Sequence, residues 1–82
     1  MDTQVEVLGI LDEVLNLGGR AKTFSLDAPL LGAVPELDSM AVIGLINLLE
    51  ERFGFVVDDD DIDGSVFETV GTLVAFVDAK LG

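Results

Sequence analysis

Apolar residues recur at helical spacing in three stretches of this chain. Within residues 3–17, Val7 and Leu11 stand four positions apart, as neighbours on one helix face do. Residues 39–53 and residues 70–81 repeat apolar side chains at the same intervals of three and four. The pattern therefore predicts three amphipathic helices, each with one face directed to a common core.

Polar residues and glycines mark the ends of these predicted helices. A side-chain oxygen at the N-cap accepts a backbone N–H of the first turn, and glycine adopts the left-handed conformation with which many helices end. The predicted N-caps are Thr3, which forms a capping box with Glu6, and then Asp38 and Thr69. The predicted helix ends are at Gly18 with Gly19 and at Gly54.

The stretch between the first two helices contains both prolines, and its apolar residues follow no clean period. We interpret residues 20–37 as a long ordered loop that places Phe24, Leu26 and Leu30 in the core; loops of this length are often functional. Residues 62–67 favour a short helical turn. The expected fold is all-α: a small four-helix bundle of three longer helices and one short helix, with the long loop between helices 1 and 2.

The length of 82 residues predicts a single domain over residues 1–82, because so short a chain has room for one core only. Half of the residues are apolar but only 6% are aromatic, so this core must be mainly aliphatic. The predicted core comprises Leu8, Leu11, Val14, Leu15, Leu26, Leu30, Val42, Ile46, Leu49, Phe53, Ile62, Phe67, Val70, Leu73 and Val77.

The charge balance excludes two classes of partner. Sixteen acidic residues against four basic ones give a formal net charge of −12. Nucleic-acid affinity needs Lys and Arg to displace counterions, and anchoring to an anionic membrane needs a basic face. No apolar run reaches the roughly 18 residues of a membrane span, and no signal peptide is visible. We therefore expect a cytoplasmic protein that binds no nucleic acid and does not insert into membranes.

The residue types that are missing narrow the possible chemistry. The chain has no His, Cys, Tyr or Trp. A Ser-His-Asp triad, a thiol nucleophile and a zinc-thiolate site are therefore impossible. What is left is carboxylate chemistry, a few hydroxyls, and chemistry supplied by an attached group.

The acidic run partly matches a calcium-binding loop. Asp59, Asp61, Asp63 and Gly64 occupy positions 1, 3, 5 and 6 of an EF-hand, but Val70 stands at position 12, where a bidentate Glu is required. We expect no dedicated metal site, and an acidic calcium-binding helical module is the less favoured alternative. Weak attraction of divalent cations is expected at Asp58, Asp59, Asp60, Asp61 and Asp63.

Ser39 is the candidate for an attached group. It follows Asp38 at a predicted helix start, where Ser is commonly no more than a cap. A hydroxyl in the first turn also stands at the positive end of the helix dipole, where free N–H groups stabilise a phosphate. With no base nearby to activate it, Ser39 suits phosphoryl attachment by another enzyme better than nucleophilic catalysis of its own.

The segment around Ser39 resembles the acyl carrier protein family around its modified serine. The matching residues are Glu36-Leu37-Asp38-Ser39-Met40, followed by Val42, Ile43, Leu45, Ile46, Leu49, Glu50, Glu51, Phe53 and Gly54. The resemblance extends over nearly the whole chain, from the opening helix through the long loop to the closing helix that begins at Thr69.

This resemblance implies that Ser39, with Asp38 beside it, accepts 4′-phosphopantetheine from coenzyme A through a separate magnesium-dependent transferase. The terminal thiol of the arm would hold an acyl group as a thioester. The protein would then be a non-catalytic carrier and a substrate of other enzymes. An aminoacyl or D-alanyl carrier of the same fold is the alternative, and the cargo stays open.

The resemblance also implies partners for a monomeric carrier: the phosphopantetheinyl transferase, and acyl-loading and acyl-processing enzymes with basic docking patches. By position, the partner-binding residues are Glu36, Met40, Ile43, Asn47, Glu50 and Glu51. Carriers of fatty-acid synthesis usually have Leu and acidic residues where Met40, Ala41 and Gly44 stand here. The recognition surface is therefore less acidic than the net charge suggests.

Overall fold

The computed structural model of the chain describes residues 2–30, 32–62 and 64–82. Its described part contains three α-helices and three short 3₁₀ segments and no strand, which confirms the all-α class. The elements are α1 (Thr3–Leu15), η1 (Arg20–Thr23), α2 (Ser39–Phe53), η2 (Asp59–Asp61), η3 (Gly64–Phe67) and α3 (Val70–Leu81). Where a short fourth helix was expected over residues 62–67, the structure has the 3₁₀ segment η3, so the described part confirms three α-helices and not a fourth.

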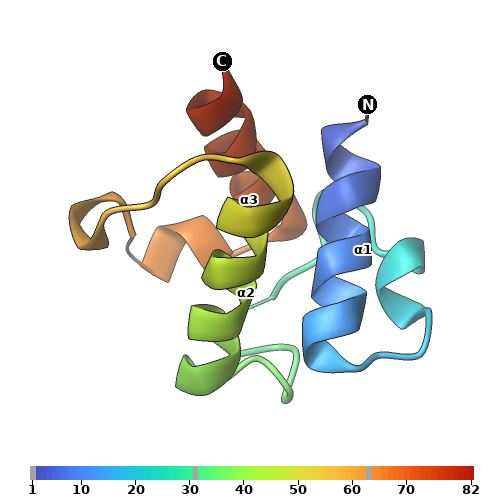
Figure 1. Cartoon of the computed structure of the whole chain (residues 1–82). Coiled ribbons are helices and arrows are strands. Elements are labelled where there is room, and N and C mark those ends of the chain that lie inside the picture. The colour runs from blue at the N-terminus through green and yellow to red at the C-terminus, as the bar shows by residue number, and fades with distance from the viewer. Residues whose placement is uncertain (1, 31, 63) are drawn as a thin grey trace.

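Helix α1 packs against both α2 and α3, and the two termini lie at the same end of the molecule (Figure 1). Arg52, near the end of α2, adds an ion pair to this packing, with its guanidinium 3.4 Å from Glu13 and 3.7 Å from Glu6 of α1. Across the described residues, no helix combines the length and apolar content that a membrane crossing would need.

The predicted ends of α2 and α3 are confirmed. The Asp38 carboxylate accepts the N–H of Ala41 at 2.8 Å and begins α2. Gly54 ends α2 in the left-handed conformation, with φ of 76°. Thr69 caps α3 through a capping box, in which the hydroxyls of Thr69 and Thr72 each accept the other's backbone N–H.

The predicted ends of α1 were wrong at both termini. The N-cap is Asp2 rather than Thr3, because the Asp2 carboxylate accepts the N–H of Gln4 at 3.0 Å. The helix ends at Asn16, which is in the left-handed conformation, before Gly18 is reached. Asn tolerates this conformation because its short polar side chain can form local hydrogen bonds.

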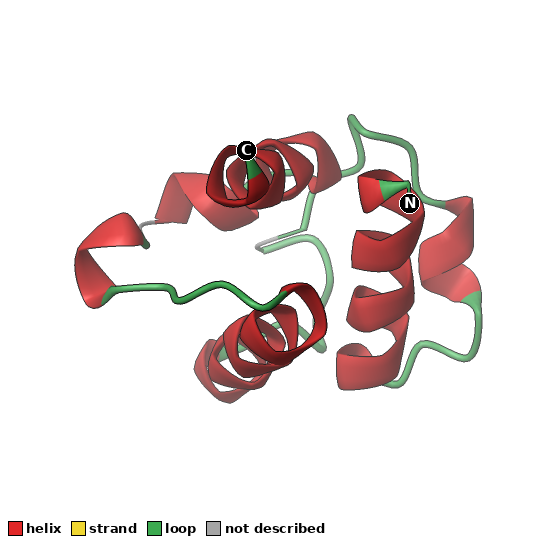
Figure 2. Cartoon of the chain, turned by 45° about the horizontal axis from the view of Figure 1, so that its top comes forward, coloured by secondary structure: helices red, strands yellow, loops and turns green. Residues whose placement is uncertain are grey.

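The long loop is held against the start of α3 by backbone hydrogen bonds. The N–H of Leu30 donates to the Glu68 carbonyl at 3.0 Å, and the N–H of Gly71 donates to the Leu26 carbonyl at 2.8 Å. Figure 2 shows the loop that leaves η1 crossing over to α3. The backbone pairing explains why this long segment is ordered, and it fixes the entry of the chain into α2.

The core is aliphatic, as predicted, but several of its members differ from the prediction. Leu45 and Leu49 are the fully buried residues of α2, so the helix is rotated relative to the predicted stripe. Leu26 is 46% exposed, although its carbonyl accepts the N–H of Gly71 in α3. Residues predicted to lie in the core that are only partly buried are Val14, Phe24, Val42, Ile46, Phe53 and Ile62. The buried core comprises Val7, Leu8, Ile10, Leu11, Leu15, Leu17, Ala21, Leu30, Leu37, Leu45, Leu49, Val66, Phe67, Val70, Leu73 and Val77.

Candidate functional site

The candidate site is built at the N-terminus of α2. Leu37 is buried in the core and anchors the end of the loop. Asp38 follows in an extended conformation and caps the helix, and Ser39 is the first helical residue. Because Asp38 makes the cap, the side chain of Ser39 is not needed for it.

The Ser39 side chain is exposed, and it does not cap α2. Its hydroxyl makes no hydrogen bond with any residue that the structure describes. The first turn of a helix presents N–H groups without intrahelical partners, together with the positive end of the helix dipole. In the structure the capping group of α2 is Asp38, and the exposed Ser39 hydroxyl takes no part in the cap.

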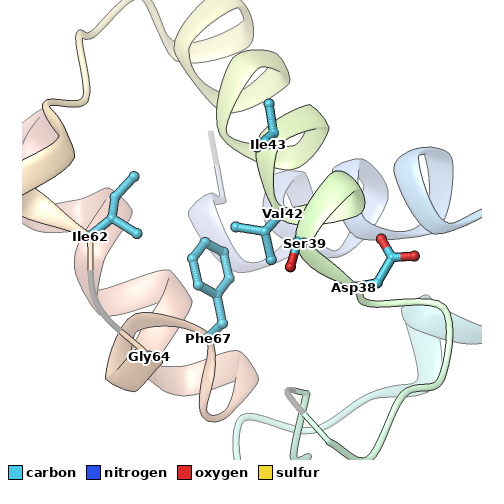
Figure 3. A pocket seen from close by; sticks show the side chains of 7 residues that line it. All are labelled: Asp38, Ser39, Val42, Ile43, Ile62, Gly64 and Phe67. Carbon is cyan, nitrogen blue, oxygen red and sulfur yellow. The ribbon is translucent and has the colours of Figure 1, made fainter.

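An open pocket of about 640 Å³ begins beside Ser39. Figure 3 shows Ser39 and Val42 on α2 facing Phe67 and Ile62 across it. The lining residues are Asp38, Ser39, Val42, Ile43, Ile62, Gly64 and Phe67. The side away from Ser39 is apolar, so the pocket can take a hydrophobic group that is held close to the serine.

The sequence did not predict this pocket. Ile62 and Phe67 were expected to be core residues, and Phe67 is indeed buried. The pocket arises because η3 packs on α3 and leaves a gap between η3 and α2. The distance between these two elements depends on tertiary packing, for which the local pattern of apolar residues carries no signal.

Four of the predicted partner-binding residues form one exposed face of α2, which we call the docking face: Met40, Ile43, Asn47 and Glu51. Their spacing of three and four positions brings them to the same side of the helix. Met40 and Ile43 are 75% and 55% exposed, and they lie three positions apart on this face.

The other two predicted partner-binding residues are engaged within the protein. Glu36 lies 2.7 Å from the Arg20 guanidinium. A hydrogen bond from its own backbone amide, and then the Arg20 side chain, hold the pKa of Glu36 below its ordinary value. Glu50 is half-buried, and its carboxylate accepts the N–H of Val57 at 2.8 Å. Sequence reasoning missed both contacts.

One residue of the acidic run, Asp61, forms an ion pair with Lys80. The Asp61 carboxylate accepts hydrogen bonds from the Lys80 ammonium and from the N–H of Asp58. These two donors, Lys80 first, lower the pKa of Asp61. Asp63 and the side chain of Asp59 lie outside the described residues, and within the described part no three acidic groups come together as a metal site would require.

Comparisons relate the chain to known proteins. A protein-family model described as a phosphopantetheine attachment site matches residues 5–77. The solution NMR structure of a holo acyl carrier protein from Nitrosomonas europaea is similar to the chain, with a TM-score of 0.91 and 52% sequence identity. That match covers 99% of this chain and 98% of the other. Among curated proteins, the search found no match.

Proposed function

Because the chain belongs to the phosphopantetheine-attachment family of acyl carrier proteins, we propose that Ser39 bears the arm and that the protein carries acyl intermediates on it. The cofactor of the chain is 4′-phosphopantetheine, held covalently. The observation that supports Ser39 is its exposed hydroxyl, which is free of hydrogen bonds to the described residues at the start of α2.

The surroundings of Ser39 fit a phosphate ester. The amide groups of the first turn and the helix dipole stabilise negative charge at this end of α2. The Asp38 carboxylate is occupied by the Ala41 N–H, so the cap stays in place when Ser39 is modified. When bound, the arm supplies a terminal thiol that holds a cargo as a thioester.

The transfer of the arm requires a second protein. The sequence contains no His and no Cys, so no side chain of the chain is suited to take the Ser39 proton near neutral pH. A phosphopantetheinyl transferase supplies that base and binds coenzyme A, and the carrier is its second substrate. The Ser39 oxygen forms a bond to the phosphate next to pantetheine, the bond between the two linked phosphates of coenzyme A breaks, and 3′,5′-adenosine diphosphate leaves. The exposed docking face on α2, next to Ser39, is the surface that transferases and acyl-processing enzymes contact.

The pocket beside Ser39 favours acyl cargo over aminoacyl cargo. Val42, Ile62 and Phe67 offer apolar contacts within reach of the attachment point. Burial of apolar surface stabilises a bound chain by roughly 25 cal/mol per Å². An ammonium group placed among these side chains would lose hydration without a charged partner, which is costly.

Intact-mass spectrometry tests the attachment site. After incubation with coenzyme A, Mg²⁺ and a broad-specificity phosphopantetheinyl transferase, the protein should gain the mass of one phosphopantetheine group. Ser39→Ala should gain nothing, while its free energy of unfolding should change by less than about 0.5 kcal/mol because Asp38 makes the cap. Ser25→Ala, which removes an exposed hydroxyl from the long loop instead of from α2, is the control and should still be loaded. A protein that gains no mass, or a Ser39→Ala variant that does, would contradict the proposal.

A further inference from the structure

The charges next to the docking face are arranged unevenly. Glu36, three residues before Ser39, pairs with Arg20 of η1 at 2.7 Å. Arg20 is held there by a second contact, because its Nε donates to the Leu17 carbonyl at 3.3 Å. Two contacts therefore place the guanidinium beside Glu36, with both side chains accessible to solvent.

At the other end of the docking face, Glu51 is exposed, and its carboxylate contacts none of the described side chains or amides. Glu50 beside it is half-buried and accepts the Val57 N–H. At the Ser39 end of the docking face, Glu36 is paired with Arg20, and Asp38 is an exposed carboxylate that caps α2. At the far end, Glu51 has no cation paired with it among the described residues.

We propose that Arg20 is a specificity-determining residue that masks Glu36 and so reduces the negative charge that a partner meets at the Ser39 end of the docking face. This inference rests on the carrier function proposed above. The partner that fits is an enzyme with an apolar surface for Met40 and Ile43, a basic group opposite Glu51, and no basic group opposite Glu36.

The physical reason is charge complementarity. A partner cation aimed at Glu36 has to displace Arg20 and would then lie beside an unpaired guanidinium of the same sign. Like charges brought together across an interface disfavour the wrong partner. Arg20 therefore selects against enzymes that place a basic group opposite Glu36, and it lowers the salt sensitivity of docking for those that bind.

Whether Arg20 masks Glu36 can be tested in the transferase reaction. The probe is a phosphopantetheinyl transferase that carries a basic docking patch. We compare the KM for the carrier and its dependence on salt in Arg20→Gln and in Lys22→Gln. Lys22 lies in the same segment η1, is exposed, and pairs with none of the described carboxylates, so its substitution changes the net charge equally without uncovering Glu36.

If Arg20 masks Glu36, Arg20→Gln lowers the KM by about two- to fivefold at low salt and steepens its rise with salt, whereas Lys22→Gln changes it by less than about 1.5-fold. In the double variant Arg20→Gln with Glu36→Gln, the KM should return to about the wild-type value, because the uncovered carboxylate is no longer present. An NMR titration gives a second readout: the pKa of the Glu36 carboxyl should rise in Arg20→Gln and stay unchanged in Lys22→Gln.

Equal effects of the two single variants would overturn the masking, since only long-range charge would then matter. A KM that stays lowered in the double variant would also overturn it. Failure of the wild-type chain to accept any phosphopantetheine would instead contradict the carrier function itself. Circular dichroism of each variant verifies that the helices are retained.

Discussion

At the scale of single residues, two helical glycines have opposite surroundings. A Cβ added to Gly71 would lie 3.0 Å from the Leu26 carbonyl oxygen, at the place where the long loop is bonded to α3. A Cβ added to Gly9 in α1 would meet nothing within 4 Å. The close approach of two backbones requires glycine at position 71. At position 9 there is room for a side chain, and a residue with higher helix propensity would fit.

Alanine substitutions at these two positions should therefore have opposite signs. Gly71→Ala should lower the free energy of unfolding by about 1–2 kcal/mol, because the loop must move away from α3. Gly9→Ala should raise it by about 0.5–1 kcal/mol through the higher helix propensity of Ala. Urea denaturation measures both changes. Stabilisation by both substitutions would show that the loop is not held tightly against Gly71.

The cap of α2 gives a second prediction at this scale. Asp38→Ala should cost about 1 kcal/mol of stability, because the Ala41 N–H loses its acceptor. Asp38→Asn should retain most of it, since an amide oxygen caps as well as a carboxylate does. Thermal unfolding compares the two variants. An equal loss in both would indicate that the charge of Asp38, and not its hydrogen bond, stabilises the helix.

At the scale of elements, the connector after α2 is tied to α3 by one charged contact. Asp61 of η2 accepts from Lys80 in the last turn of α3 and from the Asp58 N–H. Ile62 follows directly and lines the pocket beside Ser39. The ion pair therefore positions one wall of the pocket as well as the connector.

This contact should make part of the stability dependent on pH. The pKa of Asp61 is lowered in the folded protein, so the contribution of the pair is complete above the ordinary value of 3.8 and is lost as the pH falls through the lower folded-state pKa. The melting temperature of the wild type should exceed that of Lys80→Met by a constant amount near neutral pH, and this difference should shrink below about pH 3.8.

Lys22→Met is the control for the loss of one positive charge, because Lys22 pairs with no carboxylate in the described part of the chain. The difference between the two variants isolates the Asp61 contact. A Lys80→Met effect equal to that of Lys22→Met at every pH would show that Lys80 contributes only its long-range charge.

At the scale of the whole molecule, a net charge of −12 on 82 residues opposes the compact state. Three of the four basic residues, Arg20, Arg52 and Lys80, are already in ion pairs. They relieve the repulsion locally, but most carboxylates have no cation near them among the described residues.

Added salt should therefore raise the melting temperature, because screening weakens the repulsion among many acids more than it weakens a few ion pairs. Differential scanning calorimetry at increasing NaCl concentration measures the rise. The double variant Asp58→Asn with Asp60→Asn removes two exposed charges of the acidic run and should respond less to salt. A melting temperature indifferent to ionic strength in both proteins would show that the acidic surface is not strained.

The sequence by itself determined the helical class, the starts of α2 and α3, and the position of Ser39 directly after a capping Asp. These features follow from contacts within about four residues, such as the Asp38 carboxylate with the Ala41 N–H, and such contacts can be recognised from spacing alone. The ends of α1 were missed because two residues near each end could serve as caps.

Only the tertiary structure decided which predicted docking acids are free and where the pocket lies. Glu36 is paired with a residue sixteen positions earlier, and Arg52 with one thirty-nine positions earlier. Such contacts depend on how loops and helices pack in space, as does the gap between η3 and α2. The residue that carries the arm could thus be proposed from local chemistry, whereas the charge that a partner meets beside it is a property of the folded molecule.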